Sequence, residues 1–176
     1  MRKTVLFIAM SLDGYIAGSD GNVDWLAGQE ADQDDMESYE EFIRDISTVI
    51  MGWNTYHQIT TELSPENWMY SGLESYVVTH RNLPPTEEIR FTKEKVCDLV
   101  RRLRQEEGQG IWICGGADVV QQLVKEDLID QYYISAIPTL LGGGIRLFGE
   151  SNRELKLKLT GTKSYNGITD LIYERR

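Results

Sequence analysis

Residues 111–120 read IWICGGADVV, and this stretch decides the fold because an apolar run ends abruptly at two glycines. The run before Gly115 suits a buried strand, and the residues after Gly116 place apolar side chains at helical spacing. Glycine at such a turn indicates either a tight connection or the close approach of a ligand to the backbone. The stretch therefore predicts a strand, a turn and a helix, and leaves both explanations of the glycines open.

Two other strand ends are built in a related way. Residues 49–55, VIMGWNT, run from an apolar strand through Gly52 into a helix start, and residues 76–81, YVVTHR, end a strand in hydroxyl and basic groups. In open α/β sheets, ligands lie beyond the carboxyl ends of the strands, where helix N-termini offer free N–H groups. Three such ends favour an extended ligand that carries phosphate. The sequence has no GxGxxG and no GxxxxGKS/T motif, so neither a Rossmann site nor a P-loop explains them.

The order of patterns along the chain predicts the fold class. Residues 4–10, TVLFIAM, are nearly all apolar, which suits a central strand covered on both faces. Strand and helix patterns then alternate, whereas residues 155–160, LKLKLT, alternate with period two and Asn166–Gly167 signals a hairpin turn. We expect an α/β fold with a mainly parallel central sheet, helices on both faces and antiparallel C-terminal edge strands. A length of 176 residues, 41% of them hydrophobic, fits one domain over 1–176.

Charge and composition argue against several classes of partner. The net charge of −10 would repel phosphodiester backbones and anionic lipids, so we expect neither nucleic acid nor a membrane as a partner. No apolar run approaches the roughly 20 residues of a membrane-spanning helix. Cys97 and Cys114 are too few for a disulfide framework and lack the neighbours of a zinc site. We therefore expect no metal and a reduced, cytoplasmic compartment.

Four motifs, in this order and spacing, resemble the dihydrofolate-reductase-like superfamily. They are residues 11–26 (SLDGYIAGSDGNVDWL), 49–59 (VIMGWNTYHQI), 76–81 (YVVTHR) and 111–148, which open with the glycine stretch. The chain is most similar to the branch of the C-terminal reductase domain of the bifunctional riboflavin-biosynthesis deaminase/reductase, and the resemblance covers essentially the whole chain. It implies a three-layer α/β/α fold, a homodimer and an NADPH-dependent reductase. The substrate implied is a small heterocyclic or sugar-derived molecule, as for 5-amino-6-(5-phosphoribosylamino)uracil reductase.

The resemblance also assigns roles at the strand ends. In that family a non-proline cis peptide joins the glycine pair, here Gly115 and Gly116, and the pair lies against the nicotinamide. By the same resemblance, the helix that begins after Gly52 holds the pyrophosphate, and residues 79–81 surround the 2′-phosphate. Ala9 and Ile16 match positions that flank the nicotinamide. The cofactor-binding residues implied are Ala9, Ile16, Gly52, Trp53, Thr55, Thr79, His80, Arg81, Gly115, Gly116, Ala117 and Asp118.

Two departures from the family pattern bear on cofactor and substrate. The family has an arginine for the 2′-phosphate directly after the glycine of the second motif, where this chain has Trp53. The Arg81 guanidinium is a candidate replacement, since it can hold a phosphate bidentately, but NADH stays open beside NADPH. Residues 67–75, NWMYSGLES, contain no basic residue where true dihydrofolate reductases bind the folate tail. Folate is therefore disfavoured.

An acidic segment at residues 32–46 supplies the candidate catalytic group. Met36, Tyr39, Ile43 and Ile46 form one helical stripe, and Asp35 falls inside its arc, as does Asp32 if the helix starts early. An inward carboxylate can orient or protonate a substrate, as one does from this helix in the related reductases. The alternative is that these acids only favour the helix dipole.

Ser135 matches the family's hydroxyl position that faces this carboxylate, so the catalytic candidates are Asp35 and Ser135. Two other functions remain open beside the reductase. One is a non-catalytic dimer that binds a nucleotide or small ligand, which Trp53 favours. The other is a true dihydrofolate reductase, which the missing basic residue disfavours.

Overall fold

The computed structural model describes residues 1–33, 36–151 and 153–176, and its centre is an eight-stranded sheet in the order β5-β4-β3-β6-β1-β7-β10-β9. Neighbouring strands are parallel except at β10, which is antiparallel to both β7 and β9. The strands are β1 (Thr4–Ser11), β3 (Ile46–Gly52), β4 (Glu74–Val78), β5 (Ile89–Thr92), β6 (Gly110–Gly115), β7 (Gln131–Ile137), β9 (Leu157–Tyr165) and β10 (Ile168–Arg175). A small second sheet pairs β2 (Tyr15–Ala17) with β8 (Ile145–Arg146).

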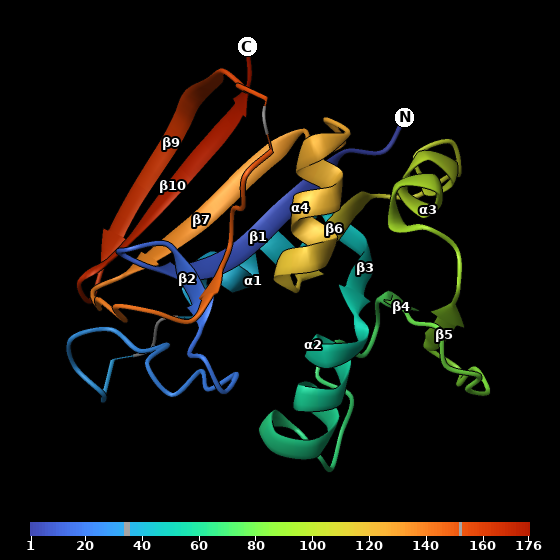
Figure 1. The fold of residues 1–176 in the computed structure, drawn as a ribbon, viewed down its shortest axis with the longest axis horizontal. Helices are drawn as coiled ribbons and strands as arrows, with labels where there is room; N and C mark the ends of the chain where they lie inside the picture. Colours follow the sequence, from blue (N-terminus) through green and yellow to red (C-terminus); the bar gives the residue numbers. More distant parts are fainter. Residues whose placement is uncertain (34–35, 152) are drawn as a thin grey trace.

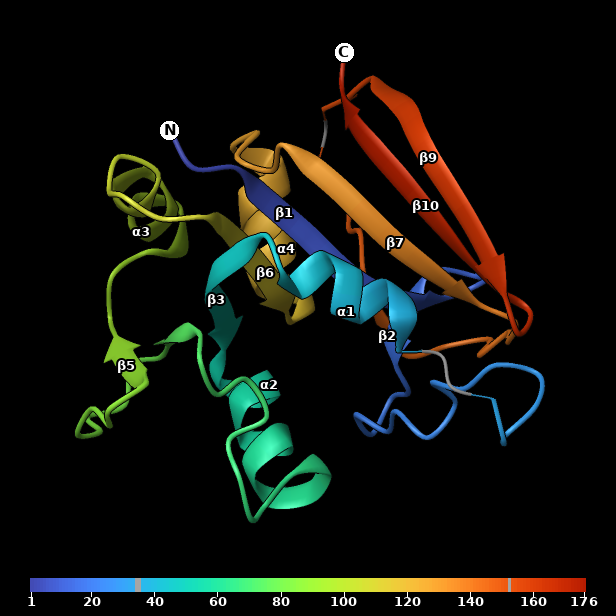
Figure 2. The ribbon, with the colours of Figure 1, turned by 180° about the vertical axis from the view of Figure 1, so that it is seen from behind.

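Helices cover both faces of the sheet. Helices α3 (Val96–Leu103) and α4 (Ala117–Lys125) lie on one face, and α1 (Glu37–Ile43) lies on the other (Figures 1 and 2). Helix α2 (Trp53–Gln58) continues into a π-helical turn, Ile59–Leu63, and extends beyond the carboxyl end of β3 (Figure 1). The predicted fold class, a mainly parallel sheet with an antiparallel C-terminal edge, is confirmed. None of the helices in the described ranges is long and apolar enough to cross a membrane.

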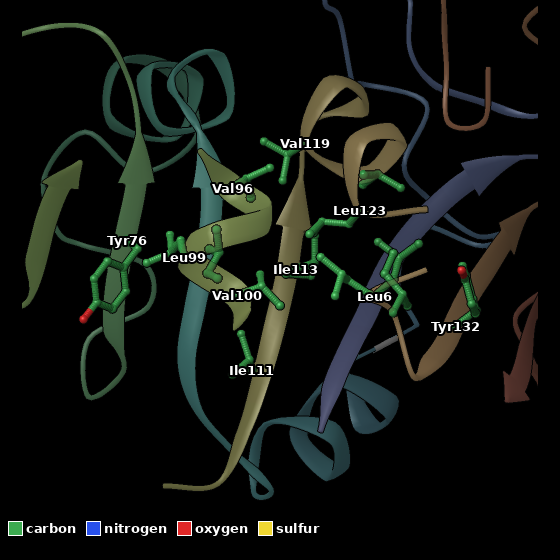
Figure 3. Close-up of a cluster of buried hydrophobic side chains, with 14 of the residues drawn as sticks. Leu6, Tyr76, Val96, Leu99, Val100, Ile111, Ile113, Val119, Leu123 and Tyr132 are labelled. Atoms are coloured by element: carbon green, nitrogen blue, oxygen red, sulfur yellow. The ribbon is translucent and has the colours of Figure 1, made fainter. Parts of the chain in front are cut away.

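The main core lies between the sheet and the pair α3 and α4 (Figure 3). The stripe of α3 is fully buried there, and the first two turns of α4 bury Val119, Val120 and Leu123. These side chains pack on Leu6 of β1 and Ile113 of β6, both 0% exposed. Burying one such aliphatic side chain contributes about 1.5–3 kcal/mol, so this face fixes how β6 and α4 meet at the glycine turn.

A second core on the opposite face is rich in aromatic side chains. Val49, Met51 and Val77 form its buried base, and Trp112 of β6 is 4% exposed. The Trp112 indole Nε1 donates a 2.9 Å hydrogen bond to the Phe7 carbonyl, which satisfies the polar atom of an otherwise apolar side chain. This face is therefore closed by rings from β1, β6 and α1.

The acidic helix is shorter than the expected segment 32–46. It spans Glu37–Ile43, while Met36 lies before it and is 50% exposed, and Ile46 begins β3 with 5% exposure. The stripe prediction was wrong at both ends. At the C-terminal end, burial of Ile46 in the sheet outweighs its fit to a helical period. Asp32 lies outside the helix and is exposed. Asp35 lies outside the described residues.

The C-terminal hairpin has the predicted tight turn. Asn166 and Gly167 have φ values of +47° and +76°, the left-handed pair that a two-residue hairpin turn requires. Asn166 also accepts a 2.8 Å hydrogen bond from the Glu30 amide and donates one of 2.9 Å to the Glu30 carbonyl. The turn thus holds the long loop after β2 against the end of the sheet.

Candidate functional site

Two glycine turns meet at the carboxyl ends of β3 and β6, which are neighbours in the sheet. The Gly115–Gly116 peptide is cis, as the resemblance implies. A Cβ placed on Gly116 would lie 3.4 Å from the Thr55 hydroxyl, and one on Gly52 would lie 4.0 Å from the Gly116 amide nitrogen. Side chains at these positions would therefore fill the space where the helices after β3 and β6 begin.

The first turns of these two helices keep free donors. Gly52 precedes α2 and Gly116 precedes α4, and neither helix has a side-chain cap in the described part of the chain. The first N–H groups of a helix have no partner within the helix and carry a partial positive charge. This geometry suits an anionic group such as a pyrophosphate.

The third strand end brings Arg81 to Trp53. The Arg81 guanidinium carbon lies 4.5 Å from the centroid of the Trp53 ring, and the His57 ring stacks on Trp53 at 5.5 Å and 17°. Thr79 is buried and its hydroxyl accepts a 3.2 Å hydrogen bond from the Arg81 amide, which orders the chain after β4. His80 is exposed. The Arg81 cation thus lies over the indole of Trp53, the residue that replaces the arginine of the family pattern.

The remaining predicted cofactor residues lie around the same turns. Ala9 is partly buried on β1 and pairs with Ser135 in the β1–β7 register. Ile16 of β2 packs against the main core. Ala117 opens α4, and the exposed Asp118 accepts a 2.8 Å hydrogen bond from Gln122 Nε2. The structure therefore brings Gly52, Thr55, Gly115, Gly116 and Ala117 together, whereas Asp118 is engaged with its own helix.

Ser135 meets a carboxylate from an unpredicted element. Its hydroxyl donates a 2.6 Å hydrogen bond to Asp170 Oδ1 on β10. Asp170 is 0% exposed and also accepts hydrogen bonds from the Tyr133 hydroxyl at 2.9 Å and the Tyr165 hydroxyl at 3.1 Å. Three neutral donors thus satisfy one buried carboxylate.

Asp170 was not predicted from the sequence, although its place on β10 carries a signal. Ile168, Asp170 and Ile172 lie on one face of β10, so an acid stands between two apolar residues on that face. Burial raises the pKa of Tyr133 to about 12, with Asp170 adding to the effect, and burial also raises the pKa of Tyr165. Both phenols therefore stay protonated and donate to Asp170 at neutral pH.

A thiol and a phenol face each other directly before the cis peptide. Cys114 Sγ lies 3.5 Å from the Tyr70 hydroxyl oxygen. Burial raises the pKa of Cys114 to about 11 and raises that of Tyr70 further above its ordinary value, with Cys114 contributing. Both groups are therefore neutral at pH 7. Neither residue was predicted, because 44 residues separate them in the chain.

Asp13 connects the loop after β1 with the loop after β7. Its carboxylate accepts hydrogen bonds from the Ser11 hydroxyl at 2.6 Å and from the amides of Leu141 and Gly142 at 3.1 and 2.7 Å. These hydrogen bonds hold the pKa of Asp13 below its ordinary value, and the bond from the Ser11 hydroxyl has the largest effect. The loop after β7 is thereby fixed against the loop after β1.

Residues 2–172 match the family model described as the RibD C-terminal domain. The chain is 42% identical over 175 residues to the uncharacterized protein YwjB of Bacillus subtilis, covering 99% of this chain and 98% of that protein. It is 24% identical over 179 residues to the riboflavin biosynthesis protein RibD of Haemophilus influenzae, covering 80% of this chain and 48% of that protein.

Two solved structures superpose on nearly the whole chain. A protein from Shewanella sp. PV-4 with a provisional riboflavin-biosynthesis name superposes with a TM-score of 0.84 at 30% identity, covering 99% of both chains. The diaminohydroxyphosphoribosylaminopyrimidine deaminase/5-amino-6-(5-phosphoribosylamino)uracil reductase of Thermotoga maritima shares the fold, with a TM-score of 0.72 at 16% identity over 99% of this chain and 57% of that one.

Proposed function

Because this chain belongs to the family of RibD C-terminal domains, we propose that it is an NADPH-dependent reductase that acts on a small heterocyclic or sugar-derived substrate. The observation that carries the proposal is the meeting of Gly52, Thr55, Gly115 and Gly116 at two uncapped helix starts. That space lies at the carboxyl ends of neighbouring parallel strands, where ligands bind in sheets of this kind.

The residues present fit a nicotinamide dinucleotide. The amides of the first turns of α2 and α4 would bind the pyrophosphate, with the Thr55 hydroxyl beside Gly116. The Arg81 guanidinium over Trp53 would bind the 2′-phosphate. The reduced nicotinamide supplies a hydride when bound.

The chain's own residues would orient the substrate. We assign Ser135 to the substrate side of the site, since it lies beside Ala9 in the sheet. The Ser135 proton points to Asp170, so its oxygen presents lone pairs to a bound molecule. A substrate group at that position must therefore be a hydrogen-bond donor. Asp35 stays a prediction for a second polar group.

The first test is cofactor binding. NADPH and NADH are titrated against the purified protein by quenching of tryptophan fluorescence, with Arg81→Ala and the matched control Arg90→Ala, an exposed arginine at β5. We expect Arg81→Ala to weaken NADPH binding by about tenfold, the effect of losing one charge-assisted contact, and to leave NADH unchanged. Absence of binding for both cofactors would contradict the reductase proposal and favour a binding protein without nicotinamide chemistry.

The homodimer implied by the resemblance is a separate proposal. Sedimentation equilibrium of the purified chain would test it, since a dimer has twice the mass of the 20.2 kDa monomer.

A further inference from the structure

A cavity of about 430 Å³ lies beside α4, and we call it the α4 cavity. The residues that line it come from the second half of α4, from Tyr132 of β7 and from the segment 148–157, which ends at the start of β9. The connection from β8 to β9 runs beside α4 in Figure 1, and Gln121 Nε2 donates hydrogen bonds of 3.3 Å to the carbonyls of Arg146 and Leu147. Among the described residues, the lining of this cavity shares none with the proposed cofactor and substrate site.

Most of the wall of the α4 cavity is apolar. Val124 of α4 and the two leucines Leu155 and Leu157 are only partly buried there. Phe148 is 43% exposed, and its ring centroid lies 6.4 Å from that of Tyr132 at an angle of 53°. The volume falls within the range of ligand pockets, roughly 300–1,000 Å³. An apolar molecule in the cavity would remove these side chains from water, which favours binding.

Tyr132 adds an unsatisfied polar atom to this apolar wall. The residue is 3% exposed, and Figure 3 shows its side chain on the face of the sheet that carries Leu6. Its hydroxyl oxygen is buried and has no hydrogen-bond partner among the residues that the structure describes. Burial raises the pKa of Tyr132 to about 12, with Asp127 adding to the effect, so the hydroxyl keeps its proton at pH 7. A buried donor without an acceptor favours a ligand that supplies one.

The charges of the lining favour an anion. The whole chain has a net charge of −10, yet the α4 cavity is lined by two cations, Lys125 and Arg153, and by one acid, Glu150. Arg153 lies 3.3 Å from Asp127 Oδ2, which balances its charge. Lys125 and Glu150 are exposed and form no ion pair with any described residue. The lining thus has one cation in excess, which matches a ligand with one negative charge.

We propose that the α4 cavity binds a small amphipathic monocarboxylate, a molecule with an apolar body and one carboxylate head. The body lies against Val124, Leu157 and Phe148. The head accepts a hydrogen bond from the Tyr132 hydroxyl and pairs with Lys125, whose ammonium group is carried on a flexible stem. This site is separate from the reductase proposal and does not depend on it.

The first test uses two probes of equal chain length, octanoate and the uncharged 1-octanol. Each is titrated into the purified protein, and amide chemical shifts followed by NMR give both the affinity and the place of binding. We expect octanoate to shift the amides of Lys125 and Ser151, which line the cavity, and to leave that of Gly116 unchanged. Octanoate should bind about three- to fivefold more tightly than 1-octanol, the effect of one exposed ion pair.

A pair of lysine variants tests the charge. Lys125→Met keeps most of the apolar stem and removes the ammonium group, so octanoate should bind as weakly as 1-octanol, and 1-octanol should bind as before. Lys93→Met is the matched control, because Lys93 is also exposed, directly follows β5 and forms no ion pair with any described residue. It should change the binding of neither probe.

Tyr132→Phe should act in opposite directions on stability and on binding. It removes a buried hydroxyl without a partner, so the free energy of unfolding in urea should stay equal or rise. Octanoate should bind about fivefold or more weakly, the effect of losing one hydrogen bond to a charged group. A loss of stability with unchanged octanoate binding would mean that a buried water satisfies the hydroxyl, and would contradict its role in the site.

Three further results would overturn the proposal: no shift of the lining amides by octanoate, equal affinity for octanoate and 1-octanol, or equal effects of Lys125→Met and Lys93→Met. A shift of the Gly116 amide in place of the lining amides would assign octanoate to the glycine turns and would also overturn it. Both lysines are exposed, so these two variants keep the test decisive even if Tyr132→Phe does not fold. None of the measurements involves NADPH, so the reductase proposal stands or falls separately.

Discussion

Ser135 and Asp170 form a 2.6 Å hydrogen bond between neighbouring strands of opposite direction, β7 and β10. The bond places a fully buried carboxylate behind the Ser135 hydroxyl, which we propose to lie on the substrate side of the site. Its acceptor comes from the C-terminal hairpin, an element that the resemblance did not connect with function. The antiparallel edge of the sheet therefore orients the Ser135 hydroxyl as well as closing the fold.

Removing the Asp170 carboxylate should destabilise the protein. Asp170→Ala leaves the hydroxyls of Tyr133, Ser135 and Tyr165 without their acceptor, and each unsatisfied buried group costs about 1–3 kcal/mol. We expect a loss of about 3 kcal/mol or more in the free energy of unfolding, measured in urea. Ser164→Ala, at an exposed position of the same hairpin, should change it by less than about 0.5 kcal/mol. Equal effects of the two variants would show that the cluster contributes no stability.

The Cys114 thiol should react slowly at neutral pH. Burial raises its pKa to about 11, so the nucleophilic thiolate is scarce until the pH approaches that value. In a Cys97→Ser background, the rate of alkylation by iodoacetamide should keep rising up to about pH 11. A rate that levels off near pH 9 would contradict the buried environment next to Tyr70.

The contacts of Asp13 should persist in mild acid. The pKa of Asp13 in the folded state is lowered, so folding favours the ionised carboxylate. The stabilising effect of this carboxylate is therefore complete above the ordinary carboxyl pKa. That effect should be lost only as the pH falls through the lowered pKa. The amide proton shifts of Leu141 and Gly142, followed by NMR, should titrate below about pH 3.9. Asp13→Asn should abolish this titration, and a midpoint at or above pH 4 would refute the prediction.

Two glycines of one loop should differ in their tolerance of a side chain. Gly144 has a φ of +130°, and a Cβ there would overlap the Ala17 carbonyl of β2, a backbone atom that cannot move freely. Gly142 has a φ of +70° but nothing within 4 Å of its Cβ position. We expect Gly144→Ala to cost about 3 kcal/mol in urea unfolding and Gly142→Ala about 1 kcal/mol. Similar costs for both would mean that β2 yields to the new methyl group.

Much of the fold follows from local patterns. The alternation of apolar runs and helical stripes predicted the strands, the buried faces of α3 and α4, and the antiparallel edge. Asn166–Gly167 predicted the hairpin turn because only a few residue types adopt its left-handed conformation. The glycines at residues 52, 115 and 116 were identified as strand-to-helix turns because each follows an apolar strand and precedes a helical pattern.

The boundaries of α1 could not be predicted from periodicity. Met36 and Ile46 fit the helical stripe, but Ile46 is buried in β3 and Met36 is exposed before the helix. A short helix gains little from its own hydrogen bonds, so burial in the sheet decides where it ends.

The sequence by itself thus determined which segments are strands and helices and where the backbone turns sharply, because these depend on residues close together in the chain. Only the tertiary structure decided the partners across the site: Arg81 over Trp53, Tyr70 beside Cys114, and Asp170 behind Ser135. The residues of each pair are 28 to 44 positions apart. The order of strands in the sheet brings them together, and that order results from burial of the whole core, which no local pattern encodes.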